Sequence, residues 1–194
     1  MNPLPTFLIA SVLAASFSHS ALSSELTQPG KYAIDQQHSN VTFEVDHLGY
    51  THVAGRFNKI SGDFSVAAGK PSSLNVIIQS ASIDTNHSKR DDHLRSPDFF
   101  NAKQFPTILF SSPLVIKTHN GESVIEGTLE LLGVSKAVTL SLQKGKEAKD
   151  PWGLYRAGYS ATGIIKRSDY GMNFMQGGIG DDIRVTVNIE AVKQ

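Results

Sequence analysis

The sequence predicts an all-β domain, an extended antiparallel barrel of about eight strands with a short helical insert near residues 88–101. Three observations support this fold class. Apolar and polar residues alternate in short segments from residue 30 onward, turn motifs separate these segments, and a single segment carries helix-start and helix-end signals instead. Because the connections are short, neighbouring strands are expected to pair antiparallel.

The alternation is clearest near the C-terminus, where positions 183, 185, 187 and 189 are apolar and the positions between them are polar. Positions 41, 43 and 45 show the same pattern. The remaining strands are expected over residues 52–66, 74–83, 108–116, 124–131, 137–142 and 155–165. Within 52–66 the apolar positions switch from odd to even, which predicts a bulge or bend near Asn58 and Lys59.

The connections have their own signals. Asn120-Gly121 predicts a two-residue hairpin turn, residues 133–136 a four-residue turn, and residues 150–153 a type I or II turn. Ser88 to Arg95 begins with a capping-box-like pattern and ends with Arg before Ser96-Pro97, which predicts a short helix. A second helical turn carrying Phe99 and Phe100 is expected after it.

Composition and charge limit the kind of partner. The 194 residues include 18 Lys and Arg against 18 Asp and Glu, so the chain offers no general attraction to nucleic acid or to an anionic membrane. The chain has no cysteine, so no disulfide can form. Residues 1–24 contain no charged side chain and hold an apolar run followed by small residues, which predicts a secretory signal over residues 1–23, cleaved after Ser20 or Ser23.

The barrel domain is expected over residues 24–194, and no later stretch is apolar for long enough to span a membrane as a helix. An eight-stranded barrel is either filled by side chains or holds one small ligand. Long strands favour a tall lumen, and aromatic and branched apolar walls suit a long hydrophobic ligand. The residues predicted to line the lumen and its mouth are Phe43, Val45, Phe57, Phe64, Phe99, Phe110, Leu129, Trp152, Tyr155 and Tyr159.

Catalytic signals are weak. The sequence has no Gly-x-Ser-x-Gly motif and no zinc-ligand spacing among its seven histidines, so no catalytic residue, metal or cofactor is predicted. The alternative is a secreted enzyme, metal-dependent or not, that uses Asp46, His47 and residues 91–93 as general acid and base. An outer-membrane barrel also fits the alternation, but its two aromatic girdles are missing and the helical insert fits a soluble rim better.

Ordered motifs extend over nearly the whole predicted domain, from Tyr32 to Val192. They are Tyr32-Ala33-Ile34-Asp35, His38-Ser39-x-Val41-x-Phe43, His47-Leu48-Gly49, Gly55-x-Phe57, Ser82-x-Asp84-Thr85, Arg90-Asp91-x-His93-Leu94-Arg95-Ser96-x-Asp98-Phe99, Phe105-Pro106, Gly127-x-Leu129 and Gly133-Val134-Ser135-Lys136. Together they resemble the YceI-like family. The resemblance implies a lipocalin-like barrel, export to the periplasm and a long-chain polyisoprenoid or similar amphiphile, such as a quinone-type lipid, bound in the lumen. It implies no established catalytic residues, and it leaves open whether the protein forms a homodimer.

Overall fold

The computed structural model describes residues 28–67, 70–113 and 116–194. Within these residues the strands are β1 (Gly30–Ile34), β2 (Asn40–His47), β3 (Thr51–Phe57), β4 (Ile60–Ala67), β5 (Lys70–Gln79), β6 (Ile83–Asp84), β7 (Thr107–Ser112), β8 (Ile116–His119), β9 (Glu122–Leu131), β10 (Val134–Lys149), β11 (Tyr155–Lys166) and β12 (Ile179–Lys193). The helices are α1 (Ser88–Arg95) and the 3₁₀ helices η1 (Ser80–Ser82) and η2 (Arg167–Tyr170). The predicted signal, residues 1–23, lies outside the described residues.

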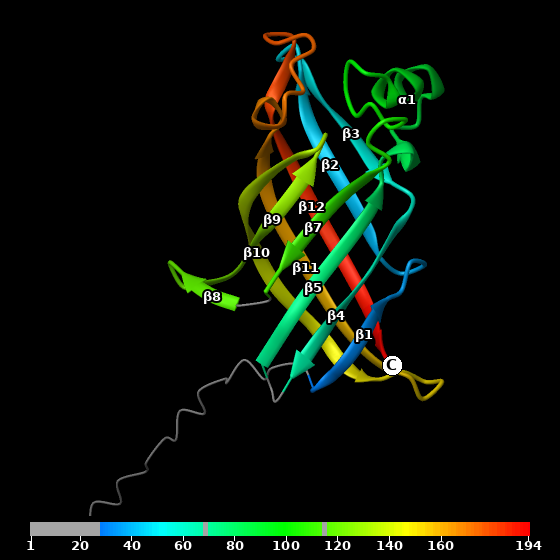
Figure 1. Cartoon of the computed structure of the whole chain (residues 1–194), viewed down its shortest axis with the longest axis vertical. Helices are drawn as coiled ribbons and strands as arrows, with labels where there is room; N and C mark the ends of the chain where they lie inside the picture. The colour runs from blue at the N-terminus through cyan, green and yellow to red at the C-terminus, as the bar shows by residue number, and fades with distance from the viewer. Residues whose placement is uncertain (1–27, 68–69, 114–115) are drawn as a thin grey trace, which may run out of the picture.

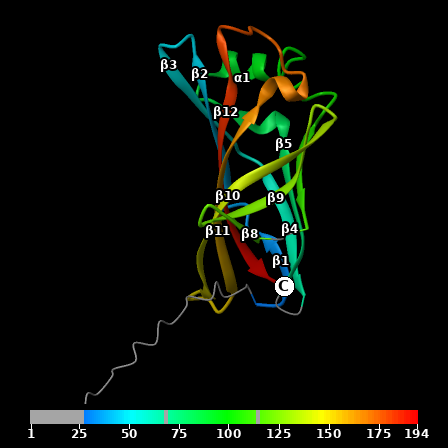
Figure 2. The ribbon, with the colours of Figure 1, turned by 90° about the vertical axis from the view of Figure 1, so that its left-hand side faces the viewer.

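The sheet closes into an antiparallel barrel of eight strand positions, which confirms the predicted fold class (Figure 1). The order around the barrel is β1, β4, β5, β7, β9, β10, β11 and β12, and β1 closes the ring by pairing with β12. β1 and β2 pair with the same edge of β12, β1 near its C-terminal end and β2 along its preceding residues, and β3 pairs with β2. The strands β10 and β12 contain 16 and 15 residues, and this length produces the tall shape seen in Figure 2.

The two ends of the barrel carry different elements. The upper end carries α1, the turn between β2 and β3, and residues 171–178 before β12 (Figures 1 and 2). The lower end carries β1, the C-terminus and the turn between β10 and β11. Strand β8 pairs with β9 away from the closed ring and projects from the side of the barrel.

The predicted break near Asn58 and Lys59 is present. β3 ends at Phe57 and β4 begins at Ile60, and these two side chains are only 5% and 2% exposed. Two residues three positions apart in a regular strand face opposite sides, so both can be buried only if the strand is interrupted. The backbone N–H of Asn58 donates to the Ser82 carbonyl oxygen over 3.0 Å, which ties the break to η1.

The turns follow the sequence signals with one correction. Asn120 and Gly121 both have positive φ, 51° and 84°, as the predicted two-residue hairpin requires. The turn expected at residues 133–136 is instead a two-residue turn at Leu132 and Gly133, with φ of 53° and 74°, and Val134 already belongs to β10. The twist of two tightly paired strands favours this shorter turn, even though it forces a leucine into the left-handed region.

The helical insert is also close to the prediction. α1 spans the expected Ser88–Arg95, but its N-cap is His87, whose Nδ1 accepts a hydrogen bond from the Arg90 N–H over 3.2 Å. The segment that carries Phe99 forms hydrogen-bonded turns and not a second helical turn. No helix in the described part of the chain is long and apolar enough to cross a membrane.

Candidate ligand-binding site

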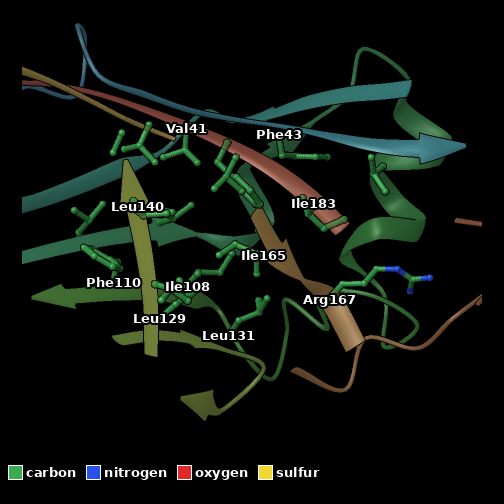
Figure 3. A pocket seen from close by; sticks show the side chains of 18 of the residues that line it. Val41, Phe43, Ile108, Phe110, Leu129, Leu131, Leu140, Ile165, Arg167 and Ile183 are labelled. Atoms are coloured by element: carbon green, nitrogen blue, oxygen red, sulfur yellow. The ribbon is translucent and has the colours of Figure 1, made fainter. Parts of the chain in front are cut away.

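An apolar cavity of about 540 Å³ runs inside the barrel. Inward-facing residues of the strands form its wall, among them Val41 of β2, Ile108 of β7, Leu140 of β10 and Ile183 of β12 (Figure 3). Because successive side chains of a strand point to opposite faces, about every second residue contributes to this wall. The volume lies within the ~300–1,000 Å³ that is usual for small-molecule sites, so the barrel is not filled by its own side chains.

Eight of the ten residues predicted from the sequence line the cavity, namely Phe43, Val45, Phe57, Phe64, Phe99, Phe110, Leu129 and Tyr159. The other two lie outside its wall. Trp152 is 83% exposed in the turn between β10 and β11, because a turn tip projects beyond the ring of strands. Tyr155 packs beside a separate cluster at the lower end, and its hydroxyl donates to Glu147 Oε1 over 3.1 Å. A role for any of these residues in holding a ligand remains a prediction.

Asp46, His47 and His93, named in the enzyme alternative, line the cavity, but its three Arg and Lys side chains were not found from the sequence. Arg90, Lys144 and Arg167 all line the cavity. Each lies in a segment whose pattern indicates only a helix, a strand or a turn, so no local signal marks it as part of a site. The aliphatic wall was detectable, because the alternation in residues 183–189 separates the lumen side of β12 from its outer side.

Three aromatic rings narrow the upper end of the cavity. His93 of α1, Phe99 of the following turn and Phe174 of segment 171–178 pack edge to face, with ring centroids 5.1–5.2 Å apart. His93 Nε2 is 2.8 Å from Asp98 Oδ2, which fixes the orientation of the imidazole. His93 is half exposed and also lines the cavity, so the lumen reaches the protein surface beside this aromatic group.

Arg167 fixes segment 171–178 over the upper end. Its side chain is 3% exposed, and burial lowers the pKa of its guanidinium, an effect that nearby Asp181 opposes. The guanidinium donates to four carbonyl oxygens, at 2.7 Å to Met172, 2.9 Å to Phe174, 3.0 Å to Ile179 and 2.9 Å to Gly180. One buried cation thereby holds a non-repetitive segment against the barrel end.

The acid and base candidates of the enzyme hypothesis have local structural contacts. Asp91 is buried and accepts hydrogen bonds from the Thr85 N–H and hydroxyl, over 2.9 and 2.5 Å. The Arg90 side chain donates to the Thr85 hydroxyl and carbonyl, both over 2.7 Å. Asp46 accepts from the Gly49 N–H within its own turn over 3.0 Å. These contacts hold α1 and the turn between β2 and β3 in place.

The lower end of the cavity is closed by packed aromatic rings. Tyr32 stacks on Phe64 with centroids 4.6 Å apart, and Tyr159 meets Phe64 edge to face at 6.0 Å. Burial, reinforced by the negative charge of Glu147, raises the pKa of Tyr32 to about 12 and also raises that of Tyr159. Burial acts to raise the pKa of Glu147 as well, but hydrogen bonds from Lys144, a backbone N–H and Tyr155 lower it overall. Glu147 is therefore ionised at neutral pH.

One group of potential metal ligands occurs among residues 28–67, 70–113 and 116–194. It consists of Asp35, His38 and Glu190. Arg156 already contacts both carboxylates, at 2.7 Å to Asp35 Oδ2 and 2.6 Å to Glu190 Oε1, and its Nε lies 2.6 Å from Asp150 Oδ2. Since these oxygens already bind a guanidinium, the group serves as an ionic junction between the residue that follows β1, β11, β12 and the turn between β10 and β11.

The fold and the cavity first define a class, that of closed antiparallel barrels with an apolar lumen. The YceI-like domain matches residues 32–191, and the chain belongs to this family. It is 38% identical over 187 residues to a UPF0312 protein of Shewanella baltica strain OS185, and the alignment covers 94% of this chain and 98% of that relative.

Solved structures show the same architecture. The YCEI protein of Campylobacter jejuni superposes with a TM-score of 0.64 at 31% identity, covering 77% of this chain and 90% of its own. BcnA of Burkholderia cenocepacia gives a TM-score of 0.71 at 19% identity, covering 81% and 98%. A polyisoprenoid-binding domain of Saccharophagus degradans gives 0.66 at 17% identity, covering 86% and 100%. The last two show a common fold.

Proposed function

We propose that this protein is a periplasmic binding or carrier protein that holds a long-chain polyisoprenoid or similar amphiphilic lipid, quinone-type lipids included, in its lumen. In this proposal the protein performs no chemistry on the lipid and needs no cofactor or metal. The name of the Saccharophagus degradans domain, which describes polyisoprenoid binding, supports the same ligand class for this chain.

The observation that carries the proposal is the apolar cavity of about 540 Å³ inside a tall barrel. Aliphatic and aromatic side chains form nearly all of its wall, so they can cover a hydrocarbon chain without leaving polar groups unpaired. Burial of each methylene is worth about 0.8 kcal/mol, which corresponds to roughly a fourfold change in Kd. Affinity should therefore rise with chain length until the lumen is full.

Polar side chains at both ends of the cavity suit the head group of an amphiphile. Arg90 and His93 line its upper end, and Lys144 lines it near the lower end. Each can donate a hydrogen bond to an oxygen-rich head group while the tail remains in the lumen.

Lipid extraction tests the proposal directly. We expect protein purified without detergent to release a hydrophobic molecule into organic solvent, identifiable by mass spectrometry. Delipidated protein should then bind isoprenoid alcohols of three, four and nine isoprene units with increasing affinity until the lumen is filled. The proposed function would be contradicted if no lipid co-purifies and none of these alcohols is taken up.

The proposed location has a separate test. Osmotic shock of the producing cells should release the protein, and its intact mass should correspond to a chain that begins at Ala21 or Ser24. A chain that keeps Met1 and stays with the cytoplasmic fraction would contradict export, whatever the lipid result.

A further inference from the structure

Three large apolar side chains are exposed together at the upper end of the barrel. Leu48 and Tyr50, in the turn between β2 and β3, are 49% and 88% exposed, and Met175 in segment 171–178 is 49% exposed. The Leu48 N–H donates to the Gly178 carbonyl oxygen over 2.8 Å, which joins the two segments. A Cβ built on Gly178 would lie 3.1 Å from Met175 Cε and 3.3 Å from Leu48 Cδ2, so both side chains pack over Gly178. We call Leu48, Tyr50 and Met175 the apolar tip.

The backbone of the apolar tip is unfavourable for the residues it carries. Leu48 has φ of 58° and Met175 has φ of 49°. This left-handed region suits glycine and asparagine, and a bulky apolar residue there is an outlier. Burial does not offset the cost of this backbone conformation, since each of the two side chains remains about half exposed. At Leu48 and Gly49 the positive φ values match those of Leu132 and Gly133 and belong to a tight turn, so the feature specific to the tip is the exposure of large apolar side chains, which marks an interaction surface.

The apolar tip is continuous with the cavity. Met175 and the exposed His47 both line the cavity, so the lumen opens beside the tip. The cavity also reaches the surface beside the hairpin of β8 and β9, where Ile116 is the large exposed apolar side chain among the described residues, at 39%. An apolar ligand that leaves through the upper opening therefore passes along apolar side chains.

The charge of the two segments indicates what kind of surface the apolar tip fits. Residues 47–52 and 171–178 contain no Lys, Arg, Asp or Glu. These two segments therefore offer no charge to a partner protein or to a strongly anionic membrane. Apolar side chains with a tyrosine at the most exposed position suit the interface of an uncharged lipid layer, where an aromatic ring is stable between water and hydrocarbon.

The lower end also exposes apolar residues, but among the described residues none of these lines the cavity. Trp152 is 83% exposed and Leu154 is 46% exposed, and neither lines the cavity. Behind them the interior is closed by Tyr32, Ala157 and Ala191, each 0% exposed. A contact at this end would not connect a lipid layer with the lumen.

We infer that the apolar tip docks on a lipid bilayer of zwitterionic composition, so that the lumen exchanges its ligand with the bilayer through the upper opening. This inference rests on the proposed function, because it takes the ligand of the lumen to be a lipid. Contact between the tip and the bilayer would spare the ligand a passage through water, where its exposed methylenes are unfavourable.

Tryptophan fluorescence shows which end makes contact. Trp152 is the single tryptophan of the chain, so the wild-type protein reports on the lower end. The double variant Trp152→Phe, Tyr50→Trp reports on the apolar tip. With phosphatidylcholine vesicles that contain brominated acyl chains, we expect quenching of the double variant and none of the wild type. Quenching of the wild type, or of neither protein, would overturn the inference.

Vesicle flotation measures the contribution of the apolar tip. We expect Leu48→Asn, Tyr50→Asn to lower the vesicle-bound fraction on the order of tenfold, because apolar contact dominates binding to an uncharged interface. Asparagine tolerates positive φ, so the substitution at position 48 should not disturb the turn. The matched control, Trp152→Asn, Leu154→Asn, changes two exposed apolar residues at the lower end and should float like the wild type.

The outcomes distinguish this inference from the proposed function. Wild-type flotation by the Leu48→Asn, Tyr50→Asn protein, or loss of flotation only in the control variant, would overturn docking through the tip. If lipid is still extracted from a protein that does not float, the proposed function stands and the docking inference falls. If no lipid is extracted or taken up, the proposed function itself falls.

Discussion

Replacing Arg167 by methionine tests whether one buried cation holds the upper end of the barrel together. Methionine keeps an apolar stem of similar length but cannot donate hydrogen bonds. The substitution would remove the donor from the carbonyl oxygens of Met172, Phe174, Ile179 and Gly180, which now accept over 2.7–3.0 Å.

The expected loss of stability follows from these contacts. A hydrogen bond from a charged group is worth about 1.5–3 kcal/mol, but water can replace part of the lost donors once the segment loosens. We therefore expect Arg167→Met to lower the free energy of unfolding by about 3–5 kcal/mol, which corresponds to the net loss of roughly two of these four hydrogen bonds. For a domain of this size, this corresponds to a fall in Tm of roughly 6–20 °C.

Urea unfolding followed by circular dichroism measures this loss. Arg184→Met is the matched control, because it removes an exposed arginine from β12 and should change the free energy of unfolding by less than about 0.5 kcal/mol. A loss below about 1 kcal/mol for Arg167→Met would show that the four carbonyls do not depend on the guanidinium. A loss equal to that of the control would refute the reasoning.

Two further predictions concern the lumen and the ionic junction. Ala161→Trp places a large ring in the cavity wall and should reduce lipid uptake at least tenfold, measured by titration with an isoprenoid alcohol. Thr162→Trp, on the exposed face of the same strand, is the control and should leave uptake unchanged. Hydrogen bonds from Arg156 and then His38 lower the pKa of Asp35 to about 2, so the folded state favours the ionised carboxylate; this stabilisation is present above about pH 4 and is lost as the pH falls toward 2. Thermal unfolding measures this at pH 7, 4 and 2.5. We expect Arg156→Gln to have a lower Tm than the wild type at pH 7, and its Tm to fall less between pH 4 and 2.5. Equal dependence of Tm on pH in the two proteins would contradict this linkage.

Local patterns in the sequence determined much of the barrel. Alternation along residues 183–189 showed which side of β12 faces the lumen, because side-chain direction in a strand depends only on position along the strand. The change of phase across residues 58–59 predicted the break between β3 and β4 for the same reason. The local helix signals placed α1 at Ser88–Arg95, although the cap is His87 and not Ser88, since helix ends are encoded within one or two turns of the chain.

Only the tertiary structure decided how distant groups meet. Nothing in the sequence indicates that Arg167 binds carbonyls of residues 172–180, although these follow it directly along the chain, because a non-repetitive segment has no periodicity that defines its path. Trp152 is aromatic like many residues that line the lumen, but it lies at a turn tip beyond the ring of strands. Strand periodicity does not extend into a turn, so it could not show this. The pairing of Leu48 with Met175 likewise depends on the start of β12 lying beside the turn between β2 and β3. Periodicity fixes the direction of a side chain within its strand, whereas closure of the barrel fixes its partners.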